Sequence, residues 1–240
     1  MSKVEQELPT KELLLGNEAI AAGCLEAGVR FAAAYPGTPS SEILQTIIAN
    51  SSKYGVVTEW SNNEMVAFEK AMGYSLCGMR AMVSMKHAGL NWVADPLSVA
   101  IMGGVRAGVV IITADDPHCH SSANEQDNRF YGLFFETLVL EPCSPAEAKE
   151  MARKAFAISE EIELPVILRT VTRVSHARSG VETSIHDDVA VHKGEFVPDK
   201  DRFWISGAKS LVRHRLLHQQ HKLLEAASEN SEFNQYEPTE

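Results

Sequence analysis

The stretch Gly55-Val-Val-Thr-Glu-Trp-Ser-Asn-Asn-Glu64, which continues as Met65-Val-Ala-Phe-Glu-Lys-Ala-Met-Gly-Tyr74, decides the fold. Its first residues are rich in β-branched side chains and predict a strand over 55–59. A polar turn follows, and the Ala- and Met-rich segment predicts a helix over 62–77. Glu64 then lies in the first turn of a helix beside the carboxyl end of a strand, which is where open α/β sheets bind ligands.

Two interpretations of Glu64 are open. Ser61-Asn-Asn-Glu64 has the pattern of a capping box, in which Ser61 caps the helix and Glu64 bonds back to the backbone. Alternatively, Glu64 is a carboxylate directed at a ligand at the edge of the sheet. The local sequence favours the capping box, so the decision depends on the rest of the chain.

The composition is that of an ordinary globular protein. Of the 240 residues, 45% are apolar and 22% are charged, and the formal net charge is -10. This acidic balance argues against nucleic-acid binding, which needs a basic surface. The polar N-terminus lacks the pattern of a signal peptide, and the apolar stretches are too short to span a membrane. The cysteines form no C-x-x-C pair and are predicted to be reduced, as in the cytoplasm: Cys24, Cys77, Cys119 and Cys143.

Apolar runs recur along the chain at the spacing of an alternating α/β protein. Further strands are predicted at 29–35, 80–86, 108–114, 138–140 and 164–171. The run 108–114 is apolar throughout, which is typical of a parallel strand that is covered on both faces. We therefore predict an α/β fold with a doubly wound, mostly parallel six-stranded sheet and helices on both faces.

Capping signals mark the expected helix starts between these strands. They are Asn17, Thr38 with Pro39, Ser122 with Glu125, and Ser144-Pro-Ala-Glu147. Residues 87–91 predict a glycine-containing turn, and Asp95-Pro96 predicts a break in the helix that follows it.

The domain organisation is expected to change near residue 180, where the α/β pattern ends. The predicted parts are a leader over 1–12, the α/β domain over 13–180, a C-terminal arm and helix over 181–228, and a disordered tail over 229–240.

Four sequence blocks occur in an order that points to a family. They are Tyr35-Pro-Gly-Thr-Pro-Ser-Ser-Glu42, Glu59-Trp-Ser-Asn-Asn-Glu64, Met85-Lys-His-Ala-Gly-Leu-Asn91 with Ala94-Asp-Pro96, and Thr113-Ala-Asp-Asp116 with Ser121-Ser-Ala-Asn-Glu-Gln-Asp127. Together they closely resemble the pyrimidine-binding (Pyr) domain of the thiamine-diphosphate-dependent 2-oxoacid:ferredoxin oxidoreductases. The resemblance is to the N-terminal domain of the α subunit of the indolepyruvate type. It runs from about Leu13 to His176 and continues weakly to near His221.

The resemblance implies a role for each block. Glu64 would be the catalytic glutamate that hydrogen-bonds the aminopyrimidine ring nitrogen of thiamine diphosphate, which overrides the capping interpretation. The turn with His87, Gly89 and Asn91 would lie against the cofactor, and the less favoured alternative is that His87 is only a hydrogen-bonded loop residue.

The block that contains Thr38 and Pro39 is similar to the substrate-side loop of the family. The Thr38 hydroxyl either binds the carboxylate or 2-oxo oxygen of the substrate, or only caps a helix.

Asp115 departs from the pyruvate-specific members of the family, which resemble this chain but carry an arginine at that position. A carboxylate cannot form the bidentate contact that an arginine makes with a substrate carboxylate. With Asp115 at the substrate, the resemblance therefore favours an arylpyruvate over pyruvate.

The resemblance also implies partners, because two parts of the family's machinery are absent from this sequence. The chain has no G-D-G…N motif for Mg²⁺ and the cofactor's diphosphate, and no cysteine cluster for iron–sulfur ligation. We expect a partner domain or subunit that binds Mg²⁺ and the diphosphate, an iron–sulfur partner that passes electrons to ferredoxin, and a γ/β-type oxidoreductase subunit. The chain should be inactive alone and should work in a homo- or hetero-oligomer.

The implied reaction is oxidative decarboxylation of an arylpyruvate, such as indolepyruvate, to its acyl-coenzyme A. Two alternatives stay open at this level. One is the α subunit of a non-oxidative two-subunit 2-oxoacid decarboxylase, and the other is a non-catalytic assembly subunit with the same fold.

Two histidine groups resemble metal sites but are predicted not to bind metal. His118-Cys-His120 occupies neighbouring positions of a short loop, which rarely give tetrahedral geometry. The helical set His214, His218 and His221 lies among basic residues and is expected to be a solvated face.

Overall fold

The computed structural model describes residues 10–184, 193–199, 202–203 and 207–234. The elements are β1 (Thr10–Leu15), α1 (Gly16–Glu26), β2 (Phe31–Ala34), α2 (Ser41–Tyr54), β3 (Val57–Trp60), α3 (Glu64–Leu76), β4 (Ala81–Lys86), α4 (His87–Gly103), β5 (Val109–Asp115), η1 (Pro117–Cys119), α5 (Phe130–Phe135), β6 (Val139–Leu140), α6 (Pro145–Ile162), β7 (Val166–Val171), α7 (Thr172–Ser175), β8 (Arg178–Thr183) and α8 (Lys209–Glu229).

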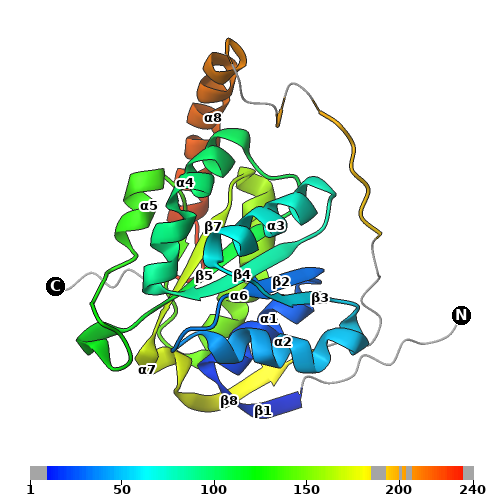
Figure 1. Ribbon diagram of the computed structural model, residues 1–240. Helices are drawn as coiled ribbons and strands as arrows, with labels where there is room; N and C mark the ends of the chain where they lie inside the picture. Colours follow the sequence, from blue (N-terminus) through cyan, green and yellow to red (C-terminus); the bar gives the residue numbers. More distant parts are fainter. Residues whose placement is uncertain (1–9, 185–192, 200–201, 204–206, 235–240) are drawn as a thin grey trace, which may run out of the picture.

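The main sheet has six parallel strands in the order β3-β2-β4-β5-β7-β6 (Figure 1), which confirms the predicted fold class. Helices α1, α2 and α6 pack together on one face, and α3 packs beside α4 on the other. The chain leaves β2 first toward β3 and then crosses back to β4. The carboxyl ends of β2 and β4 therefore flank the topological switch point, where sheets of this kind bind ligands.

The central strands are apolar because helices cover both of their faces. Every residue of β2 and β5 is buried, as the continuous apolar run over 108–114 predicts for a parallel strand. The edge strand β3 differs, since its four residues are exposed or half-buried. The sheet thus has a dry centre at β2, β4 and β5, directly behind the switch point.

A second, two-stranded sheet joins the start of the described chain to the end of the α/β unit. Strand β1 pairs antiparallel with β8, in a register that runs from Thr10↔Thr183 to Leu15↔Arg178. Residues 10–12, which we expected in a leader, and residues 181–183, which we expected in an arm, therefore belong to this sheet. The local pattern could not reveal it, because the two strands pair across the whole length of the α/β unit.

Asn17 does not cap α1, contrary to the prediction. Helix α1 begins at Gly16, and the Leu15 N–H donates to Glu18 Oε2 at 2.7 Å. Asn17 is fully buried, and its side-chain amide donates to the Pro39 carbonyl at 2.7 Å and to Glu42 Oε2 at 2.9 Å. It therefore ties α1 to the loop that follows β2.

The predicted start of α2 at Thr38 and Pro39 is also wrong. The helix begins at Ser41, because the preceding loop closes on itself. In that loop the Ser40 hydroxyl donates to the Gly37 carbonyl at 2.8 Å, and the Gly37 N–H donates to the Ser41 hydroxyl at 3.0 Å.

Helix α4 corrects two predictions. Residues 87–91 form its first turn and not a separate turn, and the helix continues without a break through Pro96. The residue whose carbonyl Pro96 leaves without a helical donor is Trp92, an exposed residue, so the solvent side of the helix accommodates the proline.

The two remaining helix starts have opposite outcomes. The box at Ser122 and Glu125 is wrong, because α5 begins at Phe130 and the Ser122 hydroxyl donates to Asp116. The start of α6 is confirmed, since the Ser144 hydroxyl accepts from the Glu147 N–H at 3.3 Å.

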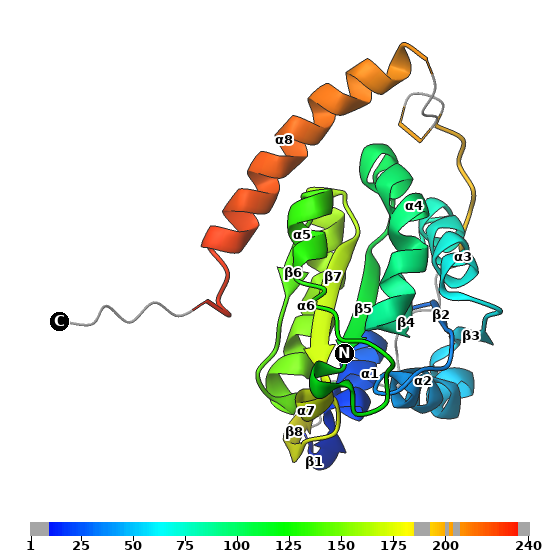
Figure 2. The same cartoon turned by 60° about the vertical axis from the view of Figure 1, so that its left-hand side comes forward.

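Helix α8 lies at the end of the sheet opposite the switch point (Figure 2). Arg213 Nε donates to the carbonyl of Met102, near the end of α4, and Gln220 Nε2 lies 3.4 Å from the carbonyl of Glu163, which ends α6. Both contacts are at the amino ends of the strands, away from the switch point. Phe233, in the segment expected to be a tail, is half-buried against the core, and residues 235–240 lie outside the described part.

Within the described residues, no helix is long and apolar enough to cross a bilayer.

Candidate functional site

The four sequence blocks meet at the carboxyl edge of the sheet. They follow β2, β3, β4 and β5, which are adjacent strands in the order β3-β2-β4-β5. Because the carboxyl ends of parallel strands share one edge, the topology brings together segments that are up to 92 residues apart, from Tyr35 to Asp127. This edge is the candidate site.

Glu64 takes no part in a helix cap, so the capping-box prediction is wrong. The N-cap of α3 is Asn63, whose side-chain oxygen accepts from the Val66 N–H at 2.8 Å. The Ser61 hydroxyl donates instead to Glu59 Oε1 at 3.0 Å. Asn63 was an equally good capping residue by type, and the local pattern gave no means of choosing it over Ser61.

Glu64 is largely buried, but its carboxylate has no partner among the described residues. The residue is 9% exposed, and no hydrogen bond or ion pair to its side chain occurs within the described part of the chain. An unpaired carboxylate at a ligand-binding edge is the arrangement expected of a group that a ligand completes.

The side chain of Glu64 packs against the backbone of Gly89. A Cβ atom at residue 89 would lie 2.6 Å from both Cγ and Oε1 of Glu64, and 2.9 Å from its Cδ. Such distances are far inside van der Waals contact, so the first turn of α4 can pass under the carboxylate only because residue 89 has no side chain. The blocks that follow β3 and β4 thus meet at one point.

His87 is the first residue of α4 and is fully buried. Its Nε2 lies 3.2 Å from Asn124 Oδ1, and its Nδ1 is buried without a hydrogen-bond partner in the described structure. An amide oxygen can only accept, so this contact favours the tautomer with the proton on Nε2. The buried Nδ1 is then an unused acceptor.

The side chain of Asn91 is engaged by the protein. Its amide and that of Gln126 form a reciprocal pair, with N···O distances of 3.0 and 2.9 Å. The Tyr131 hydroxyl also donates to Asn91 Oδ1. Asn91 therefore joins α4 to the segment after β5, and its polar atoms do not point freely toward the edge.

Thr38 and Pro39 lie in the loop after β2. Thr38 is exposed, and its hydroxyl has no hydrogen-bond partner among the residues that the structure describes. The Pro39 carbonyl is held by the buried Asn17. The capping role of Thr38 is thus excluded, and its hydroxyl is free to contact a ligand.

Asp115 is turned into the protein. It is fully buried, and its Oδ2 accepts from the Asn128 N–H and from Arg169 Nε, both at 2.9 Å. Burial raises the pKa of Asp115, although Asn128 and Arg169 act in the opposite direction. Sequence analysis did not identify Arg169 as a partner of Asp115. A charged residue inside the otherwise apolar strand over 164–171 was the feature that could have indicated it.

Asp116 begins the β5–α5 loop (residues 116–129) and anchors it. Its carboxylate accepts from the Ser121 N–H at 2.7 Å, the Ser122 hydroxyl at 2.7 Å and the Thr172 hydroxyl at 2.9 Å. Burial alone would raise the pKa of Asp116, but these hydrogen bonds outweigh it and lower the pKa to about 2.

We expect Asp116→Asn to lower the free energy of unfolding at pH 7 by about 2 kcal/mol, because an amide replaces these bonds poorly. The folded-state pKa lies below the unfolded value of about 3.9, so the charge stabilises the fold above about pH 4. That stabilisation is lost as the pH falls toward 2. Urea unfolding should show a smaller difference between the free energies of unfolding of wild type and variant at pH 3 than at pH 7. Glu125→Gln, on the same loop and exposed, should match wild type; a gap that stays constant would contradict the assignment.

The histidine groups do not form a metal centre in the described residues, where no cluster of three or more His, Cys, Asp or Glu side chains is placed to hold a metal ion. His118 and His120 have ring centroids 6.3 Å apart. On α8, His214 Nε2 and His218 Nε2 lie 3.2 Å apart, and His221 is near Glu136.

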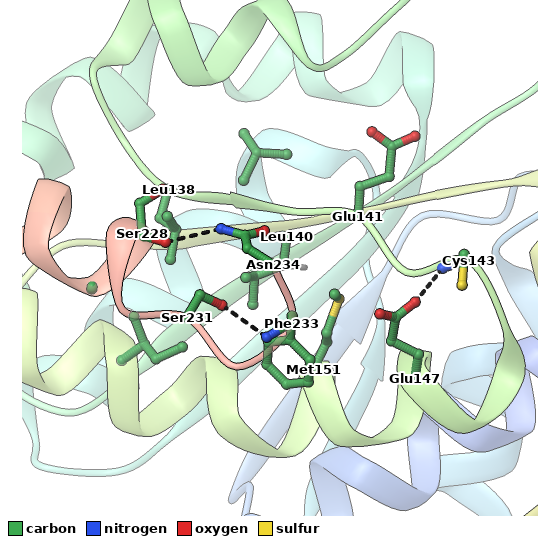
Figure 3. A pocket seen from close by; sticks show the side chains of 13 residues that line it. Leu138, Leu140, Glu141, Cys143, Glu147, Met151, Ser228, Ser231, Phe233 and Asn234 are labelled. Carbon is green, nitrogen blue, oxygen red and sulfur yellow. Dashed lines mark hydrogen bonds between the residues drawn. The ribbon is translucent and has the colours of Figure 1, made fainter. Parts of the chain in front are cut away.

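A groove of about 590 Å³ lies along the outer edge of β6 and is separate from the Glu64 site (Figure 3). Phe233 and Met151 line it, together with the exposed Cys143. A hydrogen bond with Glu147 raises the pKa of the Cys143 thiol, which keeps the sulfur protonated and unreactive.

Large apolar side chains are exposed on the adjacent helices α4 and α5. They are Trp92 (63%), Val99 (59%), Phe130 (67%), Leu133 (77%) and Phe134 (76%). Exposed apolar groups of this size mark interaction surfaces in many proteins. The surface begins next to Asn91, at the rim of the candidate site.

The sequence matches known proteins over most of its length. Residues 22–233 match a family described as pyruvate flavodoxin/ferredoxin oxidoreductase, thiamine diphosphate-binding. The indolepyruvate oxidoreductase subunit IorA of Thermococcus kodakarensis is 46% identical over 95% of this chain and 36% of its own length. That of Archaeoglobus fulgidus is 53% identical over 72% of this chain and 28% of its own length.

The chain also matches more distant proteins, one by sequence and one by structure. The 2-oxoglutarate synthase subunit KorA of Methanocaldococcus jannaschii is 27% identical over 75% of this chain and 50% of its own length. The solved 2-oxoglutarate:ferredoxin oxidoreductase of Magnetococcus marinus aligns with a TM-score of 0.74 at 17% identity, over 96% of this chain and 47% of that one.

The chain spans about a third of the length of the indolepyruvate oxidoreductase subunits that it matches. The match over residues 22–233 nevertheless includes all four blocks of the candidate site, which lie within residues 35–127. The chain therefore belongs to the thiamine-diphosphate-binding family of the pyruvate flavodoxin/ferredoxin oxidoreductases.

Proposed function

We propose that this chain is the pyrimidine-binding part of a thiamine-diphosphate-dependent 2-oxoacid:ferredoxin oxidoreductase of the arylpyruvate type. The observation that carries the proposal is the largely buried Glu64, whose carboxylate has no partner among the described residues and lies against Gly89 beside the switch point of the sheet. The family match supports thiamine diphosphate as the ligand, and the relatives named for indolepyruvate support an aromatic 2-oxoacid as the substrate class.

The residues at the edge fit the aminopyrimidine end of the cofactor. Glu64 offers an unpaired carboxylate, which can share a proton with a ring nitrogen. Gly89 leaves the space above the first turn of α4 free of a side chain. His87 Nδ1 is a buried acceptor that the protein leaves unused. Asn91 would act indirectly, by holding Gln126 against the helix that carries these groups.

Each group has a role in the proposed reaction. Thiamine diphosphate, when bound, supplies a carbon nucleophile and an electron sink. Glu64 would hold a proton at its carboxylate and share it with a ring nitrogen of the cofactor. The free hydroxyl of Thr38, next to Pro39, would orient the substrate. Asp115 would act indirectly, because its carboxylate neutralises Arg169 and so leaves that guanidinium without a free positive charge for the carboxylate of a small 2-oxoacid.

The complete enzyme would need other components. We propose a partner domain or subunit that binds Mg²⁺ and the cofactor's diphosphate, and an iron–sulfur partner with a γ/β-type subunit that passes electrons to ferredoxin. The exposed apolar surface on α4 and α5 provides area for such a partner. The overall reaction would convert the arylpyruvate and coenzyme A to acyl-coenzyme A and carbon dioxide in the cytoplasm, where the four free cysteines stay reduced.

The test is to purify the native complex and measure ferredoxin reduction with indolepyruvate and with pyruvate, in the presence of coenzyme A. We expect coenzyme A-dependent reduction with indolepyruvate and little with pyruvate. The isolated chain should show no turnover and no saturable binding of thiamine diphosphate at micromolar concentration. Decarboxylation without electron transfer would favour the non-oxidative decarboxylase, and activity of a complex depleted of this chain would favour an assembly role.

A further inference from the structure

Arg169, in β7, is a buried arginine at the centre of a charge network in which Asp115 is also buried and Glu141 and Asp127 are partly exposed. Its side chain is 7% exposed, and its guanidinium contacts carboxylates from three separate segments. Nε donates to Asp115 at 2.9 Å, Nη1 donates to Glu141, and Nη2 lies 3.8 Å from Asp127 Oδ1. The network therefore joins the ends of β5 and β6 to the end of the β5–α5 loop.

Asp115 links Arg169 to Asn128. The Asn128 N–H donates to the same Asp115 oxygen that Arg169 contacts. The Asn128 side chain is fully buried, and its amide donates to the His87 carbonyl at 3.1 Å and to the Thr113 hydroxyl at 2.6 Å. The place of Asn128 is thus set by the ion pair on one side and by the start of α4 on the other.

The β5–α5 loop contacts the first turn of α4 at two more points. Asn124 Oδ1 is 3.2 Å from His87 Nε2, and Gln126 pairs with Asn91. Gly89, against which the Glu64 side chain packs, lies between His87 and Asn91 on this turn. A displacement of the loop would release contacts on both sides of the surface that supports Glu64.

We propose that Arg169 is a positioning residue that holds the β5–α5 loop closed on the first turn of α4 through Asp115 and Asn128, and that the loop held in this way fixes the His87 imidazole through Asn124. The effect on the loop and on His87 follows from contacts within this chain. The expected effect on turnover rests on the proposed function. Arginine is needed because its planar fork reaches Asp115 and Glu141 at the same time, which a lysine cannot do.

The first experiment uses the full 240-residue chain and does not depend on activity. Hydrogen exchange over residues 116–129 and the ¹⁵N resonances of the His87 ring, assigned with His87→Gln, are compared for wild type, Arg169→Met and Arg169→Lys. In Arg169→Met we expect faster loop exchange and a change in the balance of His87 tautomers. Arg169→Lys should give a partial return toward wild type, because the charge remains and the fork is lost.

Arg80→Met is the matched control. Arg80 also forms a two-pronged ion pair, with Nε and Nη2 at 2.8 and 2.7 Å from Glu160, but at the amino edge of the sheet. It should lower stability without changing the exchange of the loop or the His87 resonances. Equal loop exchange and equal His87 resonances in wild type and Arg169→Met would overturn the proposal, whatever the loss of stability.

The second experiment uses the assembled complex. Arg169→Met should lower kcat by about 10- to 100-fold with a small change in the KM of the 2-oxoacid, because it misplaces the turn under Glu64 and leaves the Thr38 loop in place. A raised KM with unchanged kcat would overturn the positioning role. Failure of the proposed function would give a different pair of results. The Glu64→Gln complex would keep full turnover, while Arg169→Met would still change the hydrogen exchange of the loop and the ring resonances of His87.

Discussion

Replacing Glu64 by Gln should lower kcat of the assembled complex by at least about 100-fold, the scale of a lost acid–base group. Gln has nearly the same shape, so the fold and the contact with Gly89 should remain. What changes is the chemistry, because an amide cannot take up or share a proton as a carboxylate does. The measurement is the rate of 2-oxoacid-dependent ferredoxin reduction, with stability compared by thermal unfolding.

Glu59→Gln is the matched control for this substitution. Glu59 lies five residues earlier, at the same edge, but its carboxylate is paired with Lys70 at 2.5 and 2.7 Å and is partly exposed. The Glu59→Gln complex should keep turnover near that of wild type. A Glu64→Gln complex as active as the Glu59→Gln complex would remove Glu64 from the catalytic machinery.

Gly89→Ala should abolish most of the activity while leaving the fold intact. The added methyl group would lie 2.6 Å from Glu64 Cγ and Oε1, and the side chain of Glu64 can move where a backbone could not. Glu64 would therefore be displaced, and a shift of about 1 Å in a catalytic group can cost roughly 100-fold in rate. Turnover of the complex and far-ultraviolet circular dichroism of the chain test the two parts of this expectation.

Gly73→Ala provides the control for a glycine-to-alanine change inside a helix. Gly73 lies in α3, and a Cβ atom there would have nothing within 4 Å. This variant should keep full turnover and gain about 0.5–1 kcal/mol in stability, because alanine favours the helix. A Gly89→Ala complex that behaves like the Gly73→Ala complex would show that Glu64 tolerates displacement.

The parts of the fold that were predictable are those whose causes are local. The strand over 109–115 is apolar from Val109 to Ile112 because both of its faces are covered, and that pattern is visible in the sequence. The start of α6 was predictable because Ser144, Pro145 and Glu147 act within one helical turn. The family blocks placed Glu64 and Gly89 at one site, and the structure adds that they touch.

The predictions that failed depend on partners far along the chain. Asn17 reads as a helix cap, yet its amide is used by Pro39 and Glu42, which follow more than 20 residues later. Asp115 looked available to a substrate, but Arg169, on another strand, occupies it. No local pattern contains these pairings, because they exist only after the sheet has assembled in its crossed order.

The pairing of β1 with β8 closes the α/β unit on itself. Thr10 and Thr183 are neighbours in the register, so the segment between them enters and leaves the body of the protein at the same corner. Units with adjacent ends can be inserted into other polypeptides, or cut and rejoined in a new order, without being pulled apart. The two ends of the unit are therefore close enough to be joined, and a linker between residues 183 and 10 is a practical route to a circularly permuted version of it.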